Sequence, residues 1–117
     1  MLNRVVLVGR MVRDPELRRT GNGTPVASFT IAMNRNFSAQ NGERQADFIP
    51  CVSFGRTAEF AEKYFRQGMK IAITGRIQTG SYTNNEGNRV YTTEVVVEEQ
   101  EFAESKNASQ ANASAYR

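Results

Sequence analysis

The amino-acid sequence predicts an all-β protein: a five-stranded barrel with one α-helix between its third and fourth strands. Two observations predict this fold. Apolar and β-branched runs recur along the chain between turn residues, and alternating polarity within such runs is typical of half-buried strands. A single segment, residues 57–67, instead spaces its apolar residues as an amphipathic helix does.

The first two strands are expected in the first third of the chain. Residues 4–12 (RVVLVGRMV) form a β-branched run that ends at the turn signal Asp14-Pro15. A second turn follows at residues 21–23, where Gly, Asn and Gly come together. Residues 26–34 then alternate in polarity, which predicts a half-buried strand. The apolar face of that strand would hold Ala27, Phe29, Ile31 and Met33.

The third strand is expected at residues 48–54. The polar stretch before it contains Asn41-Gly42, so a long hairpin should join it to the second strand. Pro50 lies inside this strand and has no N–H for the ladder. We therefore expect the strand at a sheet edge, or with a bulge at Pro50. Cys51 is expected to be a small buried apolar residue.

The helix is expected over residues 57–67. Thr57 can cap its start, and Gly68 can end it. Phe60 and Tyr64 are expected to widen the buried stripe, so core packing is favoured for both rings over contact with a ligand. The inward face should be formed by Ala58, Ala61 and Phe65.

Two strands, residues 70–82 and 89–102, should follow the helix, joined by a hairpin tip at residues 83–88. Residues 103–117 (AESKNASQANASAYR) are too polar and too simple to pack, which predicts a disordered tail after a folded domain of residues 1–102. Three strands, a helix and two strands in this order are typical of the OB-fold. That barrel often binds oligonucleotides on one face.

The charge of the chain is uneven. Residues 1–93 carry 13 Lys and Arg against 7 Asp and Glu, whereas residues 94–117 carry 2 against 5. The basic excess therefore belongs to the folded part, which favours nucleic acid or an anionic surface as the partner. Twelve of the 15 basic residues are arginine, which both stacks on rings and binds phosphate through two hydrogen bonds.

The composition argues against several other classes of protein. A single cysteine and no histidine exclude an internal disulfide and leave no cysteine-rich metal site. Asp14 and Asp47 are the only aspartates and there is no phosphate-binding loop, so no enzyme activity, cofactor or metal is expected. The apolar run at residues 5–8 is too short for a signal peptide or a membrane span. We expect a cytoplasmic, nucleoid-associated protein that contacts no membrane.

Aromatic and basic residues alternate along the expected strands. Rings can stack on the faces of unpaired bases, while guanidinium groups replace counterions along the phosphates. This pattern predicts an interface for a single-stranded nucleic acid. The residues at even spacings are Arg35 with Phe37, Phe54 with Arg56, Phe48 with Phe54, and Arg76 with Tyr82.

Periodicity leaves open which face of the third strand turns inward. Phe48 and Phe54 lie on one face, and the smaller Ile49, Cys51 and Ser53 lie on the other. Small residues suit the narrow interior of a five-stranded barrel, which favours outward rings. Phe37 lies among polar neighbours and is expected to be exposed, whereas a core position is expected for Phe29 and Phe65.

Several segments together resemble the bacterial single-stranded DNA-binding protein family over about residues 2–102. The combination is specific, because DPE-L-R is followed by a glycine turn and V-A-x-F, and the motif YTTEVVV follows at the distance that the family shows. The segments are GRMVRDPELRRTGNGTPVASFTIA (9–32), DFIPCVSFGRTAEFAEKYFRQG (47–68), ITGRIQT (73–79) and YTTEVVV (91–97).

The resemblance implies a homotetramer of OB domains that wraps single-stranded DNA in replication, repair, recombination or DNA uptake, without catalysis or a cofactor. The stacking positions of the family, several of them tryptophan in other members, fall on Phe37, Phe48, Phe54 and Tyr82. Its basic contacts fall on Arg4, Arg18 and Arg56. Charge and position alone add Arg10, Arg35 and Arg76.

Two features depart from the family pattern. Where some members carry basic residues before the ring at position 82, this chain has Gln78-Thr79-Gly80-Ser81. Long-tailed members end in a short acidic tip that recruits replication and repair proteins, and this sequence ends in Ala-Tyr-Arg. Such recruitment is therefore not assumed. A chromosomal form, a DNA-uptake paralogue, a plasmid or phage copy and a shortened form all stay open.

Three other functions are compatible with the same barrel. An OB-fold RNA binder would use the same chemistry, and competition between DNA and RNA oligomers would identify it. A dimeric primosomal relative would differ in solution mass. A protein-interaction module with an idle groove would fail to retain DNA in a filter-binding assay.

Overall fold

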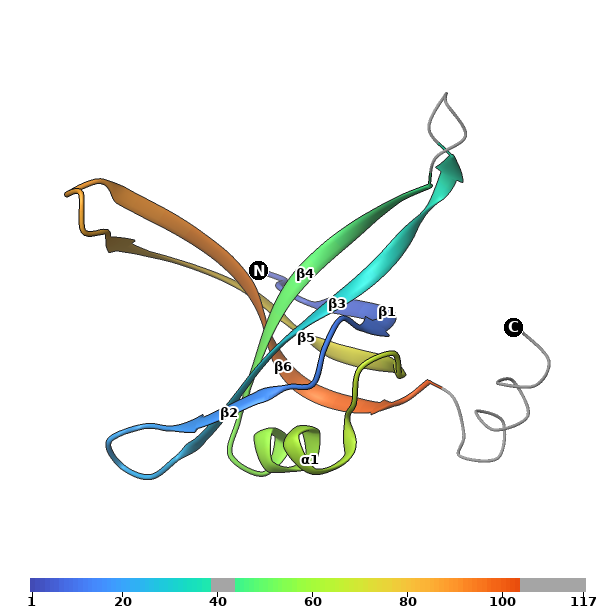
Figure 1. Ribbon diagram of the computed structural model, residues 1–117, viewed down its shortest axis with the longest axis horizontal. Helices are drawn as coiled ribbons and strands as arrows, with labels where there is room; N and C mark the ends of the chain where they lie inside the picture. Colours follow the sequence, from blue (N-terminus) through green and yellow to red (C-terminus); the bar gives the residue numbers. More distant parts are fainter. Residues whose placement is uncertain (39–43, 104–117) are drawn as a thin grey trace.

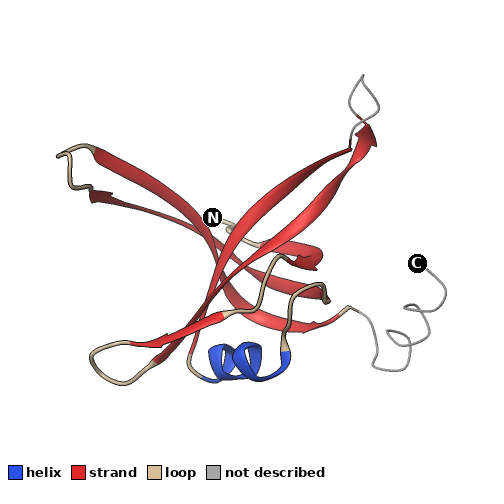
Figure 2. Cartoon of the chain, viewed as in Figure 1, coloured by secondary structure: helices blue, strands red, loops and turns tan. Residues whose placement is uncertain are grey.

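The computed structural model of the chain describes residues 1–38 and 44–103, with residues 36–38 and 44 described by their backbone alone. It is a β-barrel with one helix against it and two long hairpins that diverge from it (Figure 1; Figure 2). The turn expected at Asn41-Gly42 and residues 104–117 of the tail expected from residue 103 lie outside the described residues, whereas the Ala103 N–H donates to the backbone oxygen of Lys70, at 3.0 Å. The elements are β1 (Val5–Met11), β2 (Glu16–Arg19), β3 (Pro25–Ser38), β4 (Arg44–Phe54), α1 (Arg56–Tyr64), β5 (Lys70–Thr83) and β6 (Arg89–Phe102).

Five strands close the barrel in the order β1-β5-β6-β4-β3, and β2 extends the sheet beyond β3. Neighbouring strands pair antiparallel except β4 and β6, which pair in parallel. The ring is completed by β1–β3 pairing at Arg10–Ala32 and Met11–Ile31. This closed barrel, with its helix between β4 and β5, confirms the expected all-β OB-fold.

Gly75 allows two strands to approach closely as the barrel bends. The register between β5 and β6 shifts at Thr74–Gly75. A Cβ atom on Gly75 would lie 2.1 Å from the backbone oxygen of Val96 on β6, far inside contact distance. Only glycine fits at this position without a backbone shift.

The short strand β2 was not expected from the sequence. It pairs antiparallel with the start of β3, from Glu16–Ser28 to Arg19–Pro25. Of its four residues only Leu17 is apolar, and Leu17 packs beside the main core. A strand so short and polar has no alternation to detect, and the ladder of β3 is what holds it extended.

The expectation that Pro50 marks an edge strand or a bulge is wrong. Pro50 pairs with Thr30 of β3 in regular register, so no bulge occurs there. The strand as a whole is not at an edge, because β6 pairs with its other side. That pairing involves Cys51 and Val52 and not Pro50, so the missing N–H interrupts no bond to β6.

The helix α1 begins one residue earlier than expected and is three residues shorter at its end. Its N-cap is Gly55, with φ of 65°, and no side chain caps it, so the expected cap at Thr57 is wrong. The chain becomes extended at Phe65. The guanidinium of Arg66 donates to the backbone oxygens of Glu62 and Phe65, which satisfies carbonyls at the helix end.

The core confirms most of the expected buried residues. Phe29 and Phe65 are buried and pack edge to face, with ring centroids 6.1 Å apart. Ala58 and Ala61 of α1 are fully buried in the same core, and Cys51 is buried on β4. Burying one phenylalanine side chain contributes about 1.5–3 kcal/mol, so Phe65 is a major contact between helix and barrel.

The expectation for Phe60 and Tyr64 is wrong. Both rings lie at the surface, because the two alanines and Phe65 already cover the core beneath the helix. Phe60 and Tyr64 are therefore available for other contacts.

Candidate nucleic-acid interface

The side of the sheet that faces away from the core carries two exposed rings of β4, and we call it the outer face. Cys51 and Ser53 point into the barrel, whereas Phe48 and Phe54 on the alternate positions are 62% and 47% exposed. The structure thus decides the face that periodicity left open. The small residues occupy the narrow interior, and the rings point away from it.

Cross-strand pairing places Arg18 in the same row as Phe54, with Val26 between them. Arg18 on β2 is in register with Val26 on β3, and Val26 is in register with Phe54 on β4. Antiparallel partners point to the same face, so the three side chains form one row on the outer face. Arg56, the first residue of α1, follows Phe54 by two residues and is exposed.

Closure of the barrel forms a second row of the same composition. Arg10 on β1 is in register with Ala32 on β3, and Ala32 is in register with Phe48 on β4. The guanidinium of Arg10 donates to the backbone oxygen of Gly68, at 2.9 Å. Each exposed ring of β4 therefore shares its row with an arginine from a strand distant in sequence.

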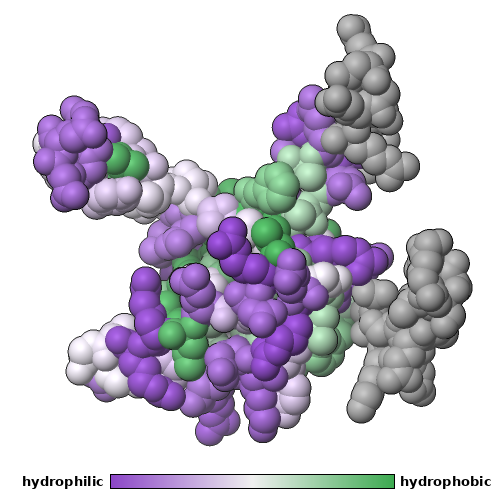
Figure 3. Space-filling view, viewed as in Figure 1, coloured by the Kyte–Doolittle hydropathy of each residue, from purple (hydrophilic) through white to green (hydrophobic). Residues whose placement is uncertain are grey.

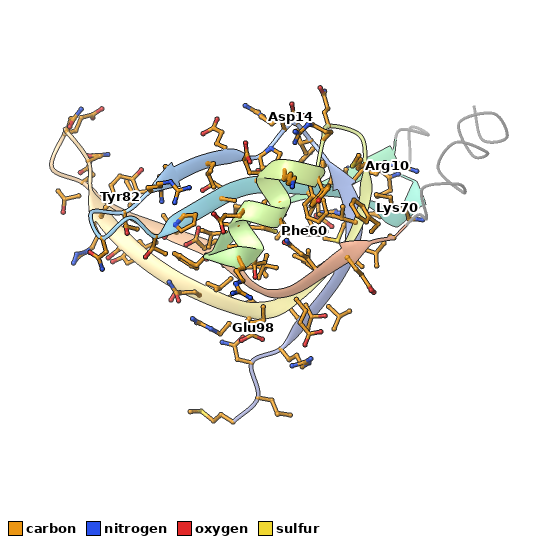
Figure 4. All side chains as sticks on the ribbon, turned by 90° about the horizontal axis from the view of Figure 1, so that it is seen from below. Arg10, Asp14, Phe60, Lys70, Tyr82 and Glu98 are labelled. Atoms are coloured by element: carbon orange, nitrogen blue, oxygen red, sulfur yellow. The ribbon has the colours of Figure 1, made fainter. Side chains whose placement is uncertain are left out.

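Tyr82 and Arg76 belong to the outer face of β5. Val52 of β4 is in parallel register with Val96 of β6, which is in antiparallel register with Arg76. Tyr82 is six positions further along β5, at even spacing, and is exposed. Figure 4 shows it far along the β5–β6 hairpin. Tyr82 and Phe48 thus lie on the two hairpins that diverge in Figure 1.

A small apolar cluster lies between these rings. Val26, Val52 and Val96 are buried together, apart from the main core. Next to them Ser28, Thr30 and Pro50 line a hollow of 320 Å³, which Glu16 and Glu94 also line. The sequence analysis missed this cluster. The sequence contains a pattern that could have indicated the cluster, since β-branched residues recur on the outward positions of β3, β4 and β6.

Two further arginines differ in their placement. Arg4 directly precedes Val5, whose partner in β5 is Gly75, so it lies beside the Arg76 end of the sheet. Arg35 donates to the Asp47 carboxylate at 2.9 Å and to the Gln45 side chain at 2.9 Å. These bonds with Asp47 raise the pKa of the Arg35 guanidinium.

Arg35 is therefore separated from the rings. Asp47 and Phe48 are adjacent on β4 and point to opposite faces, and Arg35 is bound on the Asp47 side. The sequence analysis grouped Arg35 with Phe37, and this grouping stays a prediction. Phe37 belongs to β3, but its side chain lies outside the described residues, so its position stays a prediction.

Cys51 is the one thiol of the sequence, and it is inert in this fold. Burial, with a smaller contribution from the Glu94 carboxylate, raises its pKa to about 12. The thiolate, which is the reactive form, is therefore scarce at neutral pH.

Within residues 1–38 and 44–103, no three His, Cys, Asp or Glu side chains come together as a metal site would require. No helix in that part of the chain is both long and apolar enough to cross a membrane. Figure 3 shows mostly hydrophilic residues on one face, with separate hydrophobic patches between them.

Comparison with known proteins gives a consistent picture. The single-strand binding protein family matches residues 2–103. The single-stranded DNA-binding protein of Halalkalibacterium halodurans is 56% identical over 108 residues, which cover 92% of this chain and 64% of that protein. The corresponding protein of Enterococcus faecalis is 53% identical over 110 residues, 94% of this chain and 58% of the relative.

Single-stranded DNA-binding protein A of Bacillus subtilis is 50% identical over 116 residues, 99% of this chain and 67% of the relative. The chain therefore spans about 58 to 67% of the length of these three relatives.

Proposed function

The chain belongs to the single-strand binding protein family, and from that membership we propose that it binds single-stranded DNA on its outer face without regard to base sequence. The observation that carries this proposal is the outward position of Phe48 and Phe54, each in a row with an arginine. Such rows offer a ring face and a cation to the same nucleotide segment.

The rings supply the part of the affinity that depends on unpaired bases. Phe48, Phe54 and Tyr82 each present an exposed ring, and stacking contributes about 1–3 kcal/mol per base. Phe37 is proposed as a fourth stacking position. Paired bases in a duplex hide their faces inside the helix, so this contribution favours single strands.

The arginines supply the part of the affinity that depends on salt. Arg18 and Arg56 flank Phe54, Arg10 is in the row of Phe48, and Arg4 and Arg76 lie at the β5 side. Each phosphate contact releases a condensed counterion and lowers the slope of log affinity against log salt by about 0.7 for a single strand. Neither contribution reads base identity. One barrel covers on the order of 4–16 nucleotides.

We further propose that the protein acts as a homotetramer. Val6 and Val8 are exposed on β1, whose edge opposite β5 is unpaired over Val5–Gly9 in the described structure. An exposed apolar edge strand is a template for pairing with a second copy. Several barrels in one oligomer would raise avidity, because later contacts become intramolecular. Solution mass, measured with and without poly-dT, tests this proposal.

The cellular setting follows from family membership as a proposal. Residues 1–102 would form the binding domain and residues 103–117 a tail. The protein would protect single strands in the cytoplasm, at the nucleoid, during replication, repair, recombination or DNA uptake.

Competition binding tests the proposed ligand. A labelled oligothymidine bound to the protein should be displaced by unlabelled single-stranded DNA of mixed sequence and not by duplex DNA of the same length. Displacement by RNA at equal concentration would favour an RNA-binding role instead. Failure to bind oligothymidine in dilute buffer would refute the proposal.

A further inference from the structure

The exposed side of α1 carries a second group of aromatic and basic residues, which shares only Arg56 with the outer face. Phe60 and Tyr64 are 36% and 44% exposed, and Phe102 at the end of β6 is 44% exposed. The ring centroid of Phe60 lies 4.7 Å from that of Tyr64 and 5.8 Å from that of Phe102. We call these three rings, together with Arg56 and Lys63, the helix patch.

Core packing accounts for these three rings only in part. The helix is anchored by Ala58, Ala61 and Phe65, all fully buried. Phe60 and Phe102 each pack against the ring of Phe65, at 5.7 and 5.6 Å between centroids, but 36% of Phe60 and 44% of Phe102 stay exposed. Adjoining exposed rings on a small protein commonly mark a contact site.

Cations border the rings of the helix patch. Lys63 Nζ lies 5.3 Å from the centre of the Tyr64 ring. Arg56 precedes Phe60 by four residues, so the two side chains lie one turn apart on the same side of α1. The nearest acidic residue of the first turn, Glu59, is turned toward Arg19 of β2, at 3.9 Å. The rings are thus bordered by positive charge, which suits an anionic partner.

The helix patch is held in place by a contact between α1 and β6. The Gln100 amide nitrogen donates to the backbone oxygen of Thr57, at 2.8 Å. Gln100, Thr57, Arg56 and Phe60 together line an open hollow of 240 Å³. Figure 4 shows Phe60 beside α1, far from Tyr82 on the hairpin. A ring, a cation and a concave surface therefore occur together at a second place.

We propose that the helix patch is a second stacking platform, which takes the stretch of single-stranded DNA that leaves the outer face at Phe54. The inference rests on the proposed function. Phe54 and Arg56 are separated only by Gly55, so one strand can pass from the ring of β4 to the cation of α1. This continuity favours DNA over an acidic peptide, which would share the charge but has no reason to begin at Phe54.

Binding to oligothymidines of two lengths tests the inference. Tyr64→Ala is the main variant, because Tyr64 packs on Phe60 at the surface and on no fully buried ring. An oligomer of about 8 nucleotides should fit the outer face alone, whereas one of about 30 should reach α1 as well. We expect Tyr64→Ala to weaken binding of the longer oligomer at least about fivefold, with the shorter one unchanged.

Two further variants separate a binding role from a structural one. Lys63→Gln leaves every ring in place and should make the salt dependence shallower by about 0.7 units of slope for the longer oligomer alone. Glu62→Ala is the matched control, since it shortens an exposed side chain of α1 about 160° round the helix from Tyr64. It should leave both affinities unchanged or slightly raised.

A direct readout is cross-linking with an iododeoxyuridine-substituted oligonucleotide of the longer length. Cross-links to the peptide spanning residues 57–66 support the inference. Equal affinity of wild type and Tyr64→Ala for both oligomers, with no such cross-link, overturns it. Oligoglutamate serves as the probe for an acidic peptide. If Tyr64→Ala abolishes oligoglutamate binding and leaves DNA binding intact, the inference is also overturned, because the helix patch would then serve a protein partner.

The failure of the inference differs from the failure of the proposed function. If Phe48→Ala weakens binding of both oligomers and Tyr64→Ala weakens neither, only the helix patch is refuted. If the wild-type protein binds neither oligomer, the proposed function itself is refuted.

Discussion

Replacement of Phe48 by alanine separates a stacking role from a packing role. Phe48 is 62% exposed, so only a little over a third of its surface is covered by the protein. Full burial of a phenylalanine side chain contributes about 1.5–3 kcal/mol, and the covered fraction therefore contributes roughly 1 kcal/mol. For a domain of this size, that loss lowers the melting temperature by about 4–8 °C.

The expected effect of Phe48→Ala on binding is larger than its effect on stability. Loss of one stacked base costs about 1–3 kcal/mol, which raises the dissociation constant for oligothymidine roughly 5- to 150-fold. Fluorescence anisotropy at one fixed salt concentration measures this change, because affinity itself varies with salt. Circular dichroism melting measures the stability in parallel.

Phe29→Ala provides the opposite control. Phe29 is buried against Phe65, and truncation of such a core ring costs about 3–5 kcal/mol, with a correspondingly larger fall in melting temperature. If Phe48→Ala instead resembled Phe29→Ala, with a large fall in melting temperature and unchanged affinity, the assignment of Phe48 to the outer face would be refuted.

Four other outcomes are expected. Arg56→Ala should make the slope of log affinity against log salt shallower by about 0.7, and an unchanged slope removes Arg56 from the phosphate contacts. Tyr82→Ala should weaken oligothymidine binding, whereas Tyr91→Ala, on the opposite face of the same hairpin, should not; equal effects contradict the face assignment. Gly75→Ala should lower the melting temperature strongly, because its Cβ would overlap the facing strand at 2.1 Å; an unchanged melting curve contradicts this. The Cys51 thiol, with its pKa raised to about 12, should resist alkylation near pH 8 until the protein unfolds. An unfolded thiol ionises near its usual pKa of 9.0, whereas the folded Cys51 thiol does not. The Cys51 contribution to the free energy of unfolding should therefore be lost progressively from about pH 9 to pH 12. Denaturant melts at several pH values measure this loss.

The positions of the main strands and of the helix could be predicted because they depend on local pattern. Alternation over residues 26–34 and the turn residues that bound each run predicted all five strands that form the barrel closely enough to fix their order. The exception was β2, where four mostly polar residues are held extended by the ladder of β3. No pattern in such a short segment could have indicated this partner.

The position of rings on a surface or in a core could not be read from spacing alone. Phe60 and Tyr64 have the helical spacing of core residues, and both are exposed, because the two alanines of α1 and Phe65 are the side chains that turn into the core. Phe48 and Phe54 share one face of a strand, but spacing does not say which face turns inward. In both cases the decision depends on how much apolar surface the rest of the chain leaves uncovered.

The chemistry of the interface was present in the sequence as residue types: many arginines, rings at even spacings and no catalytic set. These follow from composition and local periodicity, which require no knowledge of distant partners. The pairing of each ring with an arginine was decided by the tertiary structure. Barrel closure sets Arg10 in the row of Phe48, and the register of the β3–β4 hairpin binds Arg35 to Asp47 instead. Both depend on contacts between strands far apart in the chain, and local preferences do not encode such contacts.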